Sequence, residues 1–325
     1  MDRFKYAMAE FLPFRDKAVC ERVRAIKRAD ICKHPNKNFH IKVIEQDEAH
    51  VFAYLLDIVS GIRRSLEEGR KSYVMILPAT NPFYAWVAEM INRLRIPCHH
   101  VHTFNMDEFA DENGQTPPRD WPGGFQYHMW EDFFNRIDPQ LRMPGKQIHF
   151  PLTENVHDYS RMLEDLGGAD VCYGGIGWCG HIAFFEPHLG LEFGDDIQAY
   201  LKAGARIADL HPITVCQNVL NPDAGASGDW SWCPPKAATI GPRELAGAKR
   251  VSFWNKAPWQ RFISRLAAHG PVTPMVPASI LQILNAELIL SGGVAADITY
   301  NQGVRAHPFA FPDYAWQTEM AKFKR

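Results

Sequence analysis

The sequence predicts an α/β fold: a doubly wound, mostly parallel sheet with helices on both faces, preceded by an N-terminal helical arm. Short apolar runs alternate with longer segments of helical periodicity from His40 onward, which is typical of parallel sheets covered on both faces. A glycine-rich segment, residues 174–180, directly follows the apolar run Ala169–Tyr173. Open α/β sheets bind their ligands at such strand ends, so this segment is the first place to look for a site.

The first part of the chain is expected to be helical and then to alternate. Residues 1–39 form the arm, with two helical pieces separated near Pro13, and residues 40–325 form one domain. A strand at Ile41–Ile44 is followed by a long helix that Asp47 can cap and that ends near Gly69. After a strand at Tyr73–Leu77, Asn81-Pro82 is suited to start the next helix.

The later strands are recognised by short apolar runs bounded by turn residues. They are expected at Pro97–Val101, Ile148–Pro151, Ala169–Tyr173, Ala237–Ile240, Arg250–Phe253 and Glu287–Ser291. Two long loops rich in proline or glycine, Asp111–Gly124 and Asn221–Pro235, have the character of lids or interfaces.

Composition excludes several classes of function. A net charge of −2 gives no general attraction to nucleic acid, and we expect no membrane partner because no apolar run is long enough to span a bilayer. The basic cluster Arg22, Arg24, Lys27 and Arg28 is interpreted as the solvated face of a packing arm or of an oligomer contact. Seven cysteines without metal-ligand or disulfide spacing indicate a reducing, cytoplasmic location.

Two motifs carry the chemistry. His102-Thr103-Phe104-Asn105-Met106-Asp107-Glu108-Phe109 follows one expected strand. Gly174-Gly175-Ile176-Gly177-Trp178-Cys179-Gly180-His181-Ile182-Ala183-Phe184-Phe185-Glu186-Pro187 follows another. Ionisable groups in apolar segments beside glycine turns are costly to bury, and they therefore point to function.

Together the two motifs resemble those of the glucosamine-6-phosphate deaminase/isomerase family, over about His40 to Ala296. Three further segments match that family in the same order: Lys236–Gly241, Asn255–Ala257 and Pro277–Gln282. The resemblance implies a sugar or sugar-phosphate substrate, no cofactor and no metal, and we expect a homo-oligomer.

The resemblance also implies roles for individual residues. Asp107 would be the base that moves a proton between C2 and C1, with Glu108 beside it, and His181 would promote opening of the sugar ring with support from Glu186. The positions expected to bind the sugar and its phosphate are Thr80, Asn81, Gly175, Gly177, Gly180 and Lys256.

The chain departs from the family pattern at several of these places. Cys179 stands where the family has an aspartate that orients the histidine, so we expect Cys179 to limit deaminase activity. Phe185 stands where the family has an asparagine, which we expect to make the pocket more apolar. The loop Pro78–Pro82 lacks the glycines of the family's phosphate loop, and the family's phosphate-binding arginine aligns with about Val215. Loss of a bidentate arginine weakens phosphate binding.

Two alternative functions stay open at this point. One is hydrolysis of a sugar lactone, as in the related 6-phosphogluconolactonases, although Ile182-Ala183-Phe184 favours the isomerase. The other is a non-catalytic sugar-binding protein.

Three other interpretations are disfavoured. A dinucleotide fingerprint at Gly175, Gly177 and Gly180, with Asp195 as its acid, lacks the required helix. A cysteine nucleophile needs a direct Cys179–His181 pair, which an extended segment would place on opposite faces. His99, His100 and His102 lack a further metal ligand.

Overall fold

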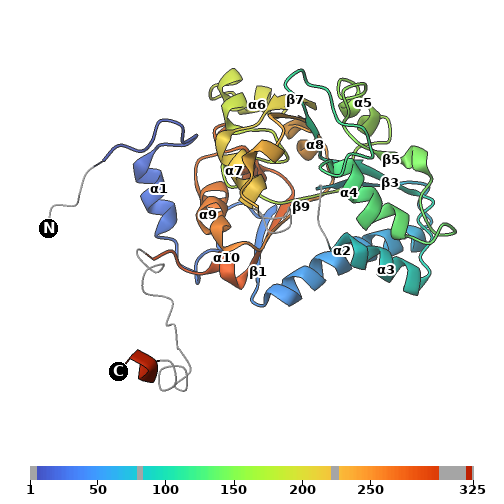
Figure 1. Ribbon diagram of the computed structural model, residues 1–325, viewed down its shortest axis with the longest axis horizontal. Coiled ribbons are helices and arrows are strands. Elements are labelled where there is room, and N and C mark those ends of the chain that lie inside the picture. The colour runs from blue at the N-terminus through green and yellow to red at the C-terminus, as the bar shows by residue number, and fades with distance from the viewer. Residues whose placement is uncertain (1–5, 79–82, 221–226, 300–319, 324–325) are drawn as a thin grey trace.

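A seven-stranded parallel sheet forms the centre of the computed structural model (Figure 1), which describes residues 6–78, 83–220, 227–299 and 320–323. The strands run in the order β1-β10-β9-β6-β2-β3-β5, and each neighbouring pair is parallel. Their bounds are β1 Phe39–Ile44, β2 Tyr73–Leu77, β3 Val101–Asn105, β5 Ile148–His149, β6 Val171–Gly174, β9 Val251–Asn255 and β10 Ala286–Ser291. The predicted fold class is confirmed.

Both faces of this sheet are covered because side chains alternate along each strand. In β2, Tyr73, Met75 and Leu77 point into a core shared with α2 (Asp47–Glu67) and α3 (Tyr84–Leu94). Val74 and Ile76 point to the opposite core, which includes side chains of α1 (Lys17–Arg24), α5 (Tyr159–Glu164) and α9 (Arg261–His269). A strand buried on both faces has no polar face, which is why Tyr73–Leu77 could be recognised from its sequence alone.

A second, smaller sheet was not predicted. It is antiparallel, with the order β4-β8-β7, and consists of β4 (Asp107–Ala110), β8 (Lys236–Thr239) and β7 (Arg206–Asp209). The predicted strand at Ala237–Ile240 therefore exists with slightly shifted bounds, but the interpretation of it as part of the parallel sheet was wrong. An apolar run predicts a strand without specifying its partner.

The remaining elements are short. The helices are α4 (Phe125–Asp132), α6 (Ile197–Tyr200), α7 (Pro212–Leu220), α8 (Pro242–Ala246) and α10 (Gly292–Ala295). The 3₁₀ turns are η1 Phe134–Arg136, η2 Gly145–Gln147, η3 Pro187–Glu192, η5 Trp230–Trp232, η6 Pro258–Gln260, η7 Pro277–Ile283 and η8 Met320–Phe323. None of the helices in the described ranges is long and apolar enough to cross a membrane.

Two local predictions were wrong in detail, and a third is not tested. The strand expected at Pro97–Val101 lies at Val101–Asn105, because the polar residues Thr103 and Asn105 are themselves buried strand residues. Asp47 lies inside the first turn of α2, and Gln46 is its N-cap. The expected helix start at Asn81-Pro82 lies outside the described residues.

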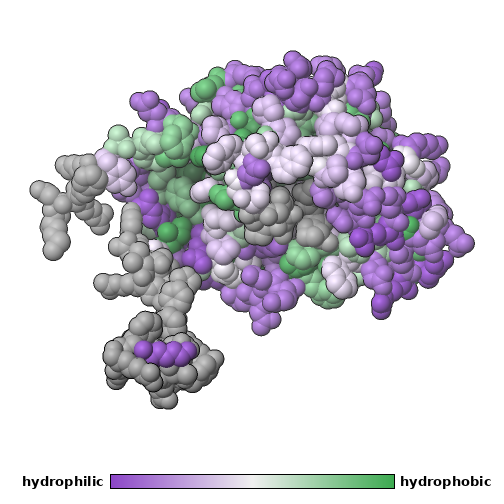
Figure 2. Space-filling model, in the orientation of Figure 1, coloured by the Kyte–Doolittle hydropathy of each residue, from purple (hydrophilic) through white to green (hydrophobic). Residues whose placement is uncertain are grey.

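From residue 6 onward, where its structure is described, the N-terminal segment forms one helix where two were expected. Asp16 caps α1 by accepting a hydrogen bond from the Val19 N–H, and residues 6–16 are not helical. The helix buries Cys20 and Val23 in its packing against α9. Figure 2 shows hydrophobic side chains around α1 and the segment before it, among which Phe11 is exposed.

The basic cluster of this segment makes contacts within the chain. Arg22 donates to the His269 carbonyl, Lys27 pairs with Asp297, and Arg28 pairs with Glu45. These contacts agree with the interpretation of the cluster as part of a packing arm.

The direction in which the chain adds strands reverses between β2 and β6. From β2 the chain continues outward to β3 and β5, whereas from β6 it continues in the other direction to β9 and β10. The carboxyl ends of the two central strands lie at this reversal, where open α/β sheets bind ligands. Met106 joins the two sheets there, because its N–H donates to the Leu77 carbonyl and its own carbonyl accepts from the Ile240 N–H.

Among the described residues, Arg265 of α9 is the largest fully buried side chain, and it links α9 to the segment after α1 and to the end of α10. Its guanidinium donates to backbone carbonyls of Ile26, Arg261, Val294, Ala295 and Ala296. We expect Arg265→Met to lower the free energy of unfolding by about 2–4 kcal/mol, because several buried carbonyls lose their donors. Denaturant unfolding measures the change.

The matched control for this prediction is Arg93→Met. Arg93 pairs with Glu89 on the surface of α3, where both side chains are exposed. Its removal should change the free energy of unfolding by no more than about 0.5 kcal/mol. Equal effects of the two substitutions on the free energy of unfolding would show that the hydrogen bonds of Arg265 contribute nothing to stability.

Candidate active site

A tight turn after the glycine-rich segment holds the predicted site together. The Phe185 N–H donates to the Ile182 carbonyl, and Ala183 lies in the left-handed region with φ of 51°. A non-glycine residue in this region costs free energy, and such strain clusters at functional sites. The turn presents the Phe184 N–H on one side and the side chains of His181 and Glu186 on the other.

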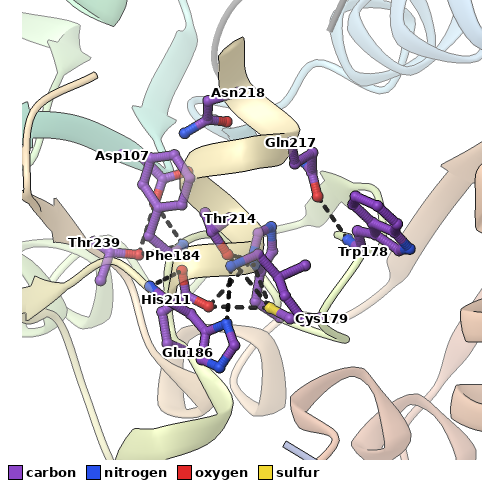
Figure 3. Close-up of polar contacts among 12 residues, drawn as sticks. Asp107, Trp178, Cys179, Phe184, Glu186, His211, Thr214, Gln217, Asn218 and Thr239 are labelled. Atoms are coloured by element: carbon purple, nitrogen blue, oxygen red, sulfur yellow. Dashed lines mark hydrogen bonds and ion pairs between the residues drawn. The ribbon is translucent and has the colours of Figure 1, made fainter. Parts of the chain in front are cut away.

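Asp107 begins β4, immediately after the junction of the two sheets. Its Oδ1 accepts hydrogen bonds from Thr239 Oγ1 at 2.6 Å and from the Phe184 N–H at 2.9 Å (Figure 3). Thr239 lies directly across from Asp107 because β4 and β8 pair at these two residues. Burial raises the pKa of Asp107 to about 7, although both hydrogen bonds act in the opposite direction.

A second cluster lies at the other end of the turn. His181 Nδ1 is 2.9 Å from Thr214 Oγ1, 3.3 Å from Glu186 Oε2 and 3.3 Å from Cys179 Sγ. Cys179 Sγ is also 3.1 Å from Glu186 Oε2, and Glu186 Oε1 accepts from the His211 N–H before α7. Figure 3 shows Thr214 on α7 beside Cys179 and Glu186.

The charges in this cluster support one another. Burial alone would raise the pKa of Glu186, but the adjacent His181 holds it below its usual value. Burial alone would lower the pKa of His181, but its neighbours Cys179 and Glu186 hold it well above its usual value. Because burial also raises the pKa of the Cys179 thiol, the negative charge that keeps His181 protonated comes from Glu186.

One sequence-based interpretation is corrected by this geometry. Cys179 and His181 were expected on opposite faces of an extended segment, yet their side chains are in contact. Gly180 between them has φ of +93°, so the backbone turns and brings both side chains to the same side. The raised pKa of the buried thiol nevertheless disfavours a cysteine nucleophile.

The glycines of the segment make room for protein groups. A Cβ atom on Gly177 would lie 1.9 Å from His181 Nε2, so the imidazole occupies the space that a side chain would need. A Cβ atom on Gly175 would lie 3.3 Å from the Trp254 carbonyl oxygen. Binding of a sugar or phosphate by Gly175, Gly177 and Gly180 stays a prediction.

Glu108 has a structural explanation that the sequence did not suggest. Its fully buried carboxylate accepts from the N–H groups of Phe109, Phe125 and Gln126. The last two N–H groups belong to the first turn of α4, where a carboxylate is favourable. The structure therefore gives Glu108 a capping role at the end of the Asp111–Gly124 loop.

The predicted phosphate residues are only partly described. Thr80 and Asn81 lie outside the described residues. Lys256 follows β9 at the same sheet edge, with its Nζ 4.5 Å from the centre of the Phe83 ring. Val215, on α7, is partly buried against the small apolar cluster of Phe109, Phe125 and Phe184.

The aromatic lining also differs from the expectation. Phe185 is fully buried in the main core, where its ring packs against Tyr200, so it does not make the site more apolar as its sequence position suggested. Phe184 lies 5.8 Å from the His181 ring and is the aromatic residue of the turn that contacts the cluster.

Sequence reasoning missed the groups that fix the two clusters. These are the hydroxyls of Thr214 and Thr239 and the N–H groups of Phe184 and His211. Thr239 lies in the segment that resembles the family's later strand, which was the one available signal. Among the described residues, Cys179, His181 and Glu186 also form a group able to hold a metal ion.

Known proteins with similar sequences are glucosamine-6-phosphate deaminases. The protein from Lachnoclostridium phytofermentans is 30% identical over 206 residues, which cover 62% of this chain and 77% of that protein. The protein from Caenorhabditis elegans is 30% identical over 203 residues, covering 60% and 67%. No protein-family model matches the chain.

Solved structures share the fold. A monomeric glucosamine-6-phosphate deaminase superposes with a TM-score of 0.63 at 19% identity, covering 78% of this chain and 98% of that one. The 6-phosphogluconolactonase of Thermotoga maritima gives 0.54 at 16% identity, covering 78% and 99%.

These findings place the protein among the α/β enzymes of sugar-phosphate metabolism. Within that class, the chain belongs to the glucosamine-6-phosphate deaminase family, as a divergent member.

The contact between Gly177 and the imidazole generates a prediction. Gly177→Ala should reduce the catalytic rate on the order of 10²-fold, because the new methyl group must displace the His181 ring. The matched control is Gly145→Ala, since a Cβ atom there meets nothing within 4 Å. Steady-state kinetics of both variants check the prediction, and a Gly177→Ala enzyme as active as the control would contradict it.

Proposed function

We propose that the protein is an aldose–ketose isomerase that acts on an amino-sugar phosphate or a related sugar, with loss of ammonia when C2 carries an amino group. One observation carries this proposal. In the turn from His181 to Glu186, the Phe184 N–H donates a hydrogen bond to the Asp107 carboxylate. The same turn carries His181, three residues before Phe184. A buried carboxylate and a buried imidazole are thereby fixed at the same sheet edge, as a proton-transfer reaction requires.

The first step is opening of the sugar ring. His181, kept protonated by Glu186, donates a proton to the ring oxygen as the bond between that oxygen and C1 breaks, and the C1 hydroxyl loses its proton to water as it becomes the aldehyde carbonyl. The hydrogen bonds that Asp107 receives from described residues end on Oδ1, so Oδ2 is the oxygen available for the next step.

Asp107 then takes the proton from C2 and returns it to C1, while the proton on the oxygen or nitrogen attached to C2 moves to O1, and the aldose becomes the ketose. A base with a pKa near the working pH suits this transfer, because it can both accept and release the proton. With an amino group on C2 the product is an imine, and addition of water releases ammonia.

Cys179 should modulate this reaction without preventing it. The charged partner of His181 is Glu186, which contacts Nδ1 directly, so the missing family aspartate is partly replaced.

We also propose that Thr80, Asn81 and Lys256 hold the phosphate. Weak phosphate binding is expected because Val215 offers no charge. The expected homo-oligomer stays a prediction.

Replacement of the base tests the proposal. Asp107→Asn should retain sugar binding and lose at least ~10²-fold of the exchange of the C2 hydrogen with solvent, since an amide cannot accept the proton. NMR of hexose and hexosamine phosphates incubated in D2O measures this exchange, and Asp209→Asn, at the exposed last residue of β7, is the matched control.

The same experiment separates the alternatives. An Asp107→Asn enzyme that exchanges at the wild-type rate would show that another group is the base. Hydrolysis of a sugar lactone by the wild type, without C2 exchange, would favour a lactonase instead. Binding without either reaction would favour the non-catalytic sugar-binding protein.

The pH dependence follows from the pKa of Asp107. The base must be ionised, so kcat/KM should fall about tenfold per pH unit below a pKa of about 7. The Thr239 hydroxyl stabilises the ionised carboxylate, and Thr239→Val should therefore move this fall to higher pH. Thr116→Val removes a hydroxyl that is hydrogen-bonded to the Thr153 hydroxyl, and it should leave the pH profile unchanged. Identical profiles for Thr239→Val and wild type would exclude Asp107 as the titrating base.

A further inference from the structure

Three different metal-binding side chains converge next to the proposed catalytic turn. The Sγ of Cys179, a ring nitrogen of His181 and a carboxylate oxygen of Glu186 lie within 4.8 Å of one another. All three side chains are buried, with the most exposed of them, His181, at 5%. We propose that Cys179, His181 and Glu186 form a binding site for Zn²⁺.

The distances between the donor atoms fit a tetrahedral ion. Zn²⁺ binds sulfur at about 2.3 Å and nitrogen or oxygen at about 2.0–2.2 Å, so neighbouring donors of a tetrahedron lie about 3.3–3.6 Å apart. The three sides of the triangle formed by Sγ, Nδ1 and Oε2 measure 3.3, 3.3 and 3.1 Å. Binding of the ion therefore requires the side chains to separate by only a few tenths of an ångström.

The chemistry of the donors selects the metal. A thiolate and an imidazole favour Zn²⁺ over Mg²⁺ or Ca²⁺, which prefer oxygen ligands. Three protein ligands leave the fourth tetrahedral position open. Thr214 Oγ1 lies 2.9 Å from Nδ1 and 3.4 Å from Sγ, beside the triangle, where it can orient a water molecule in that position.

The surroundings hold the three ligands in place. Glu186 Oε1 accepts from the His211 N–H, which leaves Oε2 directed at the other two donors. The imidazole rests against Gly177, and the turn at Gly180 places Sγ next to Nδ1. Metal sites depend on this kind of support for the orientation of their ligands.

Bound Zn²⁺ should inhibit the reaction, a consequence that rests on the proposed function although the site itself does not. Binding replaces one proton on Cys179 Sγ and one on His181 Nδ1, so two protons are released. The metal-bound imidazole keeps a proton on Nε2, but loss of that proton would leave an imidazolate. The metal-bound imidazole is therefore a much weaker acid than the imidazolium needed for ring opening.

The metal site is tested on the full-length protein without any sugar. After treatment with a chelator, the wild type should bind one equivalent of Zn²⁺. With Co²⁺ as the probe, it should show a thiolate-to-cobalt charge-transfer band and the visible bands of a tetrahedral site. Cys179→Ser should lose the thiolate band and weaken Zn²⁺ binding at least about 100-fold. Cys32→Ser, at an exposed cysteine in the N-terminal segment, is the matched control.

A second variant and a second readout keep the test decisive. Glu186→Gln should also weaken Zn²⁺ binding, and thermal unfolding establishes that each variant is folded. Absence of bound Zn²⁺, a cobalt spectrum without the thiolate band, or equal binding by Cys179→Ser and wild type would overturn the site.

Inhibition is measured separately from binding. Micromolar Zn²⁺ should slow C2 exchange by the wild type reversibly, with recovery after chelation. Stoichiometric Zn²⁺ binding without any loss of exchange would overturn the inhibitory role and leave the site intact. Failure of every sugar to exchange would count against the proposed function and would not alter the metal-binding result.

Discussion

The hydrogen bond from the Phe184 N–H to Asp107 Oδ1 is the contact on which the candidate site depends. It joins the turn after the parallel sheet to the first residue of the small antiparallel sheet. The left-handed conformation of Ala183 belongs to the same turn, and the strain it stores is balanced by this bond and by the bond to Thr239. Without the contact, the carboxylate at the start of the small sheet and the imidazole of the turn would have no fixed relation.

Glu186 makes the second connection, between the turn and α7. Its two carboxylate oxygens have different partners: Oε1 accepts from the His211 N–H, and Oε2 faces Cys179 and His181. This arrangement explains how a family member without the usual aspartate can keep a charged histidine. The same arrangement, with a thiol in place of that aspartate, produces a set of donors suited to a soft metal ion.

The sequence predicted the parallel sheet well where strands are buried on both faces, as at Tyr73–Leu77, because no polar residue interrupts them. It failed at Val101–Asn105, where buried polar residues hide the strand, and at Lys236–Thr239, whose partner depends on distant contacts. Asp107, His181 and Glu186 could be identified from their motifs. Thr214 could not, since a helix 33 residues further along supplies it, and the Cys179–His181 contact depends on the positive φ of Gly180.

The central claim is that one turn places the base and the acid against the same sugar. A crystal structure with an open-chain 2-amino sugar alcohol phosphate tests it most directly. We predict that Asp107 Oδ2 lies within about 3.2 Å of the ligand at C1 or C2 and that His181 contacts the same molecule. A ligand bound at another edge of the sheet, or one that reaches only one of these two residues, would contradict the account.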